Sequence, residues 1–171
     1  LQPLLYCART EVCDHTAEQS LGLSRLVTVN PTFNNALVQN LAGGNTMVMN
    51  KAAQTLIGTA SYRAAPVSHD WWCYQLITGA GGRVIYDPNL CLKYRQHDSN
   101  LVGSNLGLRQ QLLRAKSLMS GRYRDWNDRN IAALTENIKL LSEGNRQTLK
   151  TFQVVRAASL IIRLSAIITM K

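Results

Sequence analysis

The alternation of apolar and polar residues predicts four strands, each a short apolar run bounded by turn-forming residues. They cover Leu4–Ala8, Asn45–Asn50, Arg83–Tyr86 and Leu90–Tyr94. The second of these strands follows directly on Gly43-Gly44, which predicts either a simple turn or a close approach of the backbone to a ligand. Asp87-Pro88-Asn89 predicts a turn between the last two strands, and the aperiodic stretch from Arg9 to Val29 predicts an irregular connection.

Helical spacing fills the intervals between these strands and takes over completely after residue 105. Three helices are expected in the first part, at Thr32–Asn40, Lys51–Ile57 and His69–Thr78, the last with Ser68 as its N-cap. Three more follow at Leu106–Met119, Asn127–Glu143 and Arg146–Met170, separated by Gly121 and by Gly144-Asn145. The chain therefore divides into an α/β part, residues 1–105, and a helical part, residues 106–171.

Charge distinguishes the same two parts. The 171 residues carry a net charge of +9, of which residues 1–108 contribute +1 and residues 109–171 contribute +8. Such a basic tail suits an anionic surface, either lipid or nucleic acid. Nucleic acid is disfavoured because the basic residues alternate with long apolar runs, and only Tyr123, Trp126 and Phe152 offer stacking surfaces.

The end of the chain leaves two interpretations open. As a helix, 146–171 places Arg156, Ser159 and Arg163 on one narrow polar face, which suits an in-plane helix on anionic lipid. The alternative is a helix packed back on the rest of the protein. A membrane-spanning helix is not expected, because arginines interrupt the apolar stretch from Phe152 to Met170.

The four cysteines, Cys7, Cys13, Cys73 and Cys91, show no Cys-x-x-Cys spacing. That spacing would indicate a zinc site or a redox pair. We therefore expect free, buried thiols in a reducing compartment.

Residues Ser68 to Gly103 concentrate the candidate chemistry. Asp70, in the first turn of a helix beside two indoles, could serve as a general base or merely cap its helix. Trp71 and Trp72 cannot face the same way, so one could line a groove and stack on a sugar ring. The Arg95 guanidinium has paired N–H donors whose geometry matches diphosphate oxygens. For His97 three interpretations stay open: a metal ligand, a phosphate contact or an ordinary surface histidine.

Four sequence elements in order carry a family resemblance: GGNTMVMN at 43–50, SHDWW at 68–72, GGRVIYDP at 81–88 and YRQHDSNLVG at 94–103. Together they resemble the C-terminal half of the family 2 glycosyltransferases, which have the Rossmann-like GT-A fold. Within that family the chain looks most like rhamnosyltransferase-type enzymes that build O-antigen and other bacterial surface polysaccharides. The resemblance covers about Leu4 to Asn105.

The resemblance implies a role for each matching position. Asp70 is implied to be the catalytic base, which takes the proton from the acceptor hydroxyl as that oxygen attacks the anomeric carbon with inversion. His97 is implied to lie near the donor diphosphate and its divalent metal, Mg²⁺ or Mn²⁺. The positions implied to contact substrate are Gly44, Asn45, Thr46, His69, Trp71, Trp72, Arg95 and Gln96. The implied partners are a nucleotide-sugar donor and a glycan or lipid-linked acceptor.

One departure from the family limits what the resemblance implies. The sequence contains no Asp-x-Asp motif, which in such enzymes ends the nucleotide-binding half and holds the metal. The expectation is therefore a partial GT-A domain without its N-terminal nucleotide-binding half, inactive on its own, cytoplasmic or peripheral at the inner face of the cytoplasmic membrane. A non-catalytic half-domain that binds glycan or membrane as a partner of another protein is the alternative.

Overall fold

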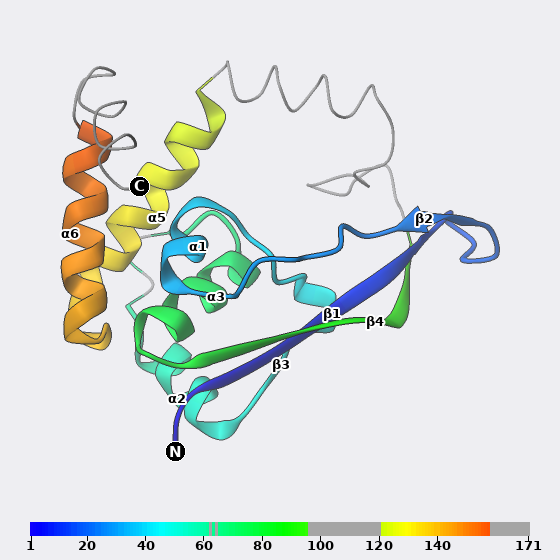
Figure 1. The fold of residues 1–171 in the computed structure, drawn as a ribbon, viewed down its shortest axis with the longest axis horizontal. Coiled ribbons are helices and arrows are strands. Elements are labelled where there is room, and N and C mark those ends of the chain that lie inside the picture. The colour runs from blue at the N-terminus through cyan, green and yellow to red at the C-terminus, as the bar shows by residue number, and fades with distance from the viewer. Residues whose placement is uncertain (62, 64, 96–120, 158–171) are drawn as a thin grey trace.

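The computed structural model describes residues 1–61, 63, 65–95 and 121–157, and shows a mixed α/β fold (Figure 1). Its strands are β1 (Leu4–Cys13), β2 (Ser20–Leu23), β3 (Val48–Met49) and β4 (Arg83–Arg95). Its helices are α1 (Phe33–Val38), α2 (Lys51–Thr59), α3 (His69–Gly79), α5 (Arg122–Glu136) and α6 (Glu143–Ala157), with short 3-10 turns η1 (Gly44–Thr46) and η2 (Ile138–Leu140).

The sheet is organised around β1. Strand β4 runs parallel to β1 along its whole length, from Leu4 opposite Arg83 to Cys13 opposite Arg95 (Figure 1). Strands β3 and β2 pair antiparallel with opposite ends of β1. Because parallel neighbours need a crossover connection, the helices α1, α2 and α3 all lie in the chain between β1 and β4.

The structure corrects three predictions about the strands. The stretch after Arg9 is not wholly irregular, since β1 continues to Cys13 and β2 pairs with it. The strand expected at 45–50 is reduced to Val48–Met49, after the 3-10 turn η1. The turn expected at 87–89 is a bulge inside β4, because the register advances from Ala8 opposite Asp87 to Arg9 opposite Leu90.

The helices of the first part agree with prediction in position, and their caps explain where they begin. The Thr32 hydroxyl accepts a hydrogen bond from the Asn35 N–H (3.2 Å) at the start of α1. The Asn50 side chain does the same for the Ala53 N–H (2.9 Å) at the start of α2. In the helical part, the break predicted at 144–145 is wrong, because both residues lie in α6. The helix expected at 106–119 lies outside the described residues.

Helix α3 is the centre of the core. Every residue from Trp71 to Gly79 is buried, and two hydrophobic clusters meet on this helix. The first joins α3 to the sheet through Leu5, Cys7, Trp71, Tyr74, Ile77 and Val84. The second joins it to α1 and to the helical part through Phe33, Leu37, Trp72, Leu76, Ala133, Leu134, Leu141 and Leu149. A helix that is apolar all round is expected in such a buried position.

The cysteines are free, as predicted, and Cys7, Cys13 and Cys73 are buried. The prediction of burial is wrong for Cys91, which is exposed. Burial raises the pKa of Cys7 to about 11, so this thiol remains protonated at neutral pH. None of the helices in the described part of the chain has the length and apolar character needed to cross a membrane.

Candidate functional site

The turn η1 is fixed to the sheet by one side chain. The Thr46 hydroxyl accepts a hydrogen bond from the Ala8 N–H (3.0 Å) and donates to the Gly43 carbonyl (3.1 Å). Thr46 is buried, whereas its neighbour Asn45 is exposed. The Thr46 hydroxyl thus holds the turn against β1, and Asn45 is the side chain of η1 that faces outward.

The start of α3 differs from the predicted cap. Ser68 occupies the N-cap position, but its hydroxyl makes no capping hydrogen bond. Asp70 lies in the first turn, partly buried, and its Oδ1 accepts the hydrogen bond of the Trp71 N–H (2.7 Å). A carboxylate here is stabilised by the exposed N–H groups of the helix start. The second Asp70 oxygen, Oδ2, has no hydrogen-bond partner among the described residues.

Gly44 and the start of α3 meet in space. A Cβ added to Gly44 would lie 2.7 Å from His69 Nε2 and 3.4 Å from Asp70 Cβ. The two segments are 25 positions apart in the chain, and only a residue without a side chain permits this approach without a shift. Gly44, Asn45, His69 and Asp70 therefore form one site, which we call the turn site.

Cys73 lies one helical turn after Asp70 and is buried. Burial raises the pKa of its thiol, and the charge of Asp70 adds to the increase. The thiol therefore remains protonated and does not act as a nucleophile beside the carboxylate.

Neither tryptophan offers a stacking surface for a sugar. Trp71 is 4% exposed and Trp72 is 3% exposed. They face opposite sides of α3, as predicted, but each enters a hydrophobic cluster rather than a groove. Trp71 Nε1 donates to the Ala36 carbonyl (2.7 Å), which locks α3 onto α1.

Arg95 is not brought to the turn site. It is the last residue of β4 and pairs with Cys13, whereas η1 is bonded to Ala8. Cys13 lies five positions along the extended strand from Ala8, a distance of about 17 Å at roughly 3.3 Å per residue. Gln96 and His97 lie outside the described residues. Within the residues that the structure describes, no group of three His, Cys, Asp or Glu side chains could hold a metal ion.

A second polar cluster lies on the sheet, at the bulge of β4. The Tyr6 hydroxyl donates to Asp87 Oδ2 (2.8 Å) and lies 3.2 Å from Cys91 Sγ. Since the phenol gives its one proton to Asp87, the Cys91 thiol is the donor to the Tyr6 oxygen. The hydrogen bond from the Asn89 N–H holds the pKa of Asp87 below its usual range, and the hydrogen bond from the Tyr6 hydroxyl lowers this pKa further. Hydrogen bonds to Cys91 and Asp87 raise the pKa of Tyr6. The sequence contained no signal for this cluster, because only the β1–β4 register brings Tyr6 to Asp87.

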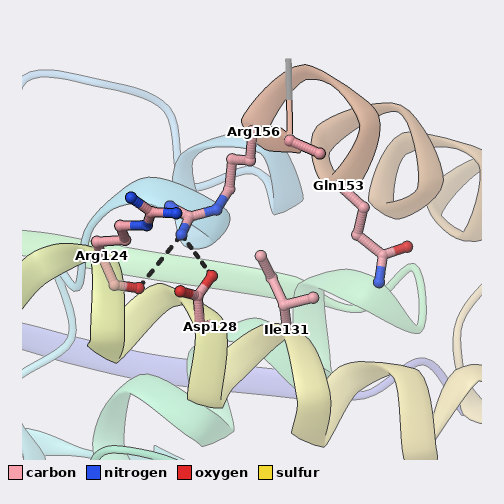
Figure 2. A pocket seen from close by; sticks show the side chains of 6 residues that line it. Arg124, Asp128, Ile131, Gln153 and Arg156 are labelled. Atoms are coloured by element: carbon pink, nitrogen blue, oxygen red, sulfur yellow. Dashed lines mark hydrogen bonds and ion pairs between the residues drawn. The ribbon is translucent and has the colours of Figure 1, made fainter. Parts of the chain in front are cut away.

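The described part of the tail, α6, packs back on α5. Leu149 is buried in the second cluster, and Arg156 forms an ion pair with Asp128 (2.6 Å) and donates to the Arg124 carbonyl (3.2 Å). Figure 2 shows the two contacts of Arg156, which lie at a pocket between the two helices. The volume of this pocket is about 260 Å³. Of the two interpretations of the tail, the packed helix is thus the one seen up to Ala157; residues 158–171 lie outside the description.

Comparison of the chain with protein-family models, with curated proteins and with solved structures finds no match.

Proposed function

We propose that the chain is the acceptor-side part of an inverting family 2 glycosyltransferase of the GT-A fold. In this proposal it transfers a sugar from a nucleotide-diphosphate donor to a glycan or lipid-linked acceptor, together with a nucleotide-binding half. Two features support it: the order of motifs along the chain, and a mixed α/β fold in which parallel strands are joined through helices. Rhamnose is the donor sugar to test first, since the resemblance is greatest to rhamnosyltransferases.

The contact between Gly44 and the start of α3 is the observation that carries the proposal. Motifs that the sequence separates by 25 positions meet at one partly exposed carboxylate. An inverting displacement needs a single base on the face of the sugar opposite the leaving group. Asp70 is the acidic residue of this site, held at the start of a helix that is otherwise buried.

The residues of the turn site then have separate roles. The Asp70 carboxylate takes the proton of the acceptor hydroxyl as its oxygen forms the new bond to the anomeric carbon. The bond from that carbon to the diphosphate breaks on the other side. Asn45 and His69, both exposed, orient the acceptor. Trp71 and Trp72 act indirectly, by fixing α3 within the core.

The test is the Asp70→Asn variant of an enzyme that carries this chain together with a nucleotide-binding half. Transfer from nucleotide-diphosphate sugars, followed by chromatography of the product, should fall by about 10²–10⁴-fold, the usual contribution of a general base. Asp125→Asn is the matched control, because Asp125 occupies the first turn of α5 and is exposed. Wild-type transfer by Asp70→Asn would refute the assignment and favour the alternative, a non-catalytic glycan-binding half-domain.

A further inference from the structure

Side chains of the helical part bind the backbone of the segment that leads into α3. The Asn130 Oδ1 accepts the hydrogen bond of the Val67 N–H (3.1 Å), and the Asn137 Oδ1 accepts that of the Ser61 N–H (2.7 Å). Between these two points, the Arg129 guanidinium donates to the Ala65 carbonyl (3.2 Å). The described residues of this segment, 61, 63 and 65–67, lie outside helices and strands, so α5 and its C-cap Asn137 supply partners for their backbone.

The other end of α3 is held from the same part of the chain. The Asn145 Nδ2 donates to the carbonyls of Thr78 and Gly79, each at 3.0 Å. The Ser142 N–H also donates to the Gly79 carbonyl (2.9 Å). The last carbonyls of a helix have no partner within the helix, and here α6 and the residue before it provide them.

The Asn130 side chain binds Val67 through its oxygen, but its nitrogen is buried without a hydrogen-bond partner among the described residues. Its side chain is 1% exposed, and its Nδ2 has no hydrogen-bond partner among the described residues. A buried amide group without a partner lowers stability, so an apolar side chain of similar size would pack at this point with less penalty. An apolar side chain could not accept the hydrogen bond of the Val67 N–H, which the Asn130 amide does accept. Val67 lies three residues before Asp70.

We propose that Asn130 and Asn145 are positioning residues, which set where α3 lies along its axis and so hold Asp70 and His69 against Gly44. The geometric part of this inference stands by itself, and its catalytic meaning rests on the proposed function. The helical part is then a component of the turn site, although none of the residues that bind α3 belongs to that site.

The experiment compares Asn130→Ala with the wild-type 171-residue chain by NMR and hydrogen exchange. In the variant, the Val67 amide should exchange about tenfold faster, the effect of losing one hydrogen bond of ordinary strength. The Gly44 amide and the His69 ring signals should shift, since α3 can move relative to η1. Thr135→Ala is the control on the same helix, because its hydroxyl donates to the Ile131 carbonyl (2.7 Å) and accepts from Gln153 Nε2 (3.1 Å), and neither contact reaches α3 or the residues before it.

Rescue separates positioning from general destabilisation. Asn130→Asp keeps an acceptor oxygen for Val67, and its carboxyl, buried where Asn130 is 1% exposed, takes up a proton and stays uncharged like the amide. This variant should therefore return the Gly44 and His69 signals toward their wild-type positions. If Asn130→Ala does not fold, Asn145→Ala provides the same measurement from the other end of α3. Unchanged Gly44 and His69 signals in Asn145→Ala and in any folded Asn130→Ala would overturn the inference, as would equal shifts in Thr135→Ala.

The outcome is independent of the test of the proposed function. Wild-type transfer by Asp70→Asn would remove the catalytic role and leave the NMR result as it stands. Unshifted signals would remove the positioning role and leave Asp70 as the candidate base.

Discussion

Replacing Gly44 by alanine tests the close contact on which the turn site depends. The added methyl group would lie 2.7 Å from His69 Nε2 and 3.3 Å from His69 Cε1, so either the turn η1 or the His69 ring must move. Asp70 Cβ, at 3.4 Å, is at ordinary contact distance. His69 is exposed and its ring is the flexible end of a side chain, so the ring leaves its place at a cost of about 0.5–1.5 kcal/mol. We expect Gly44→Ala to lower the free energy of unfolding by that amount.

A double-mutant cycle isolates this contact. Urea denaturation gives the free energy of unfolding of Gly44→Ala, His69→Ala and the double variant. Since the methyl group meets the imidazole, the double variant should be no less stable than His69→Ala alone, with a coupling of about 0.5–1.5 kcal/mol. Gly58→Ala is the matched control, because a Cβ there meets nothing within 4 Å and the residue lies in α2. It should be stabilising, by about 0.5–1 kcal/mol.

Two results would refute the reasoning. Gly44→Ala with wild-type stability would mean that η1 and α3 do not approach each other as the structure has them. An equal loss in the presence and absence of the His69 ring would mean that the alanine is disfavoured for another reason, such as its backbone conformation.

Three further predictions follow from contacts elsewhere. The pKa of Asp87 is lowered in the folded protein, so the ionised carboxylate stabilises the fold above the ordinary Asp pKa. This stabilisation is lost as the pH falls through the lowered pKa, and Asp87→Asn should therefore flatten the acid limb of a plot of stability against pH. Gly79→Ala would put a methyl group 2.5 Å from Leu141 Cδ2 and should cost about 1–3 kcal/mol, seen as a thermal midpoint below that of the wild type, whereas the midpoint of Gly58→Ala should not fall. The Arg156–Asp128 pair joins side chains 21% and 58% exposed, so Asp128→Ala should cost less than about 1 kcal/mol, a difference that vanishes in 1 M salt.

The strands and helices of the first part were predictable because their signals are local. Thr32 and Asn50 act as caps through atoms three residues away, and a helix that begins at such a residue can be read from neighbouring positions. The predictions failed where pairing with a distant strand decides the conformation. Residues 9–13 lack an apolar pattern and are nevertheless strand, because β4 pairs with them along its whole length. For the same reason Asp87-Pro88-Asn89 forms a bulge and not a turn.

The candidate site shows the same division. The sequence identified Asp70 as a candidate residue and placed it in the first turn of a helix, since both conclusions depend on neighbouring residues. It could not decide which way the two indoles face relative to a surface, because that depends on what packs on each side of α3. Both proved to be core residues. Nor could the sequence show that Arg95 lies far from Asp70, because the distance between them depends on how far β1 and β4 extend beyond η1.

By itself, the sequence determined the class of secondary structure, the helix at 69–78 with an acidic first turn, and the free cysteines, because periodicity, capping and spacing are properties of short segments. Only the tertiary structure decided that Gly44 meets His69, that Tyr6 meets Asp87, and that Asn130 and Asn145 hold the two ends of α3. These contacts join residues 25 to 81 positions apart, and no local preference specifies which distant surfaces bury one another.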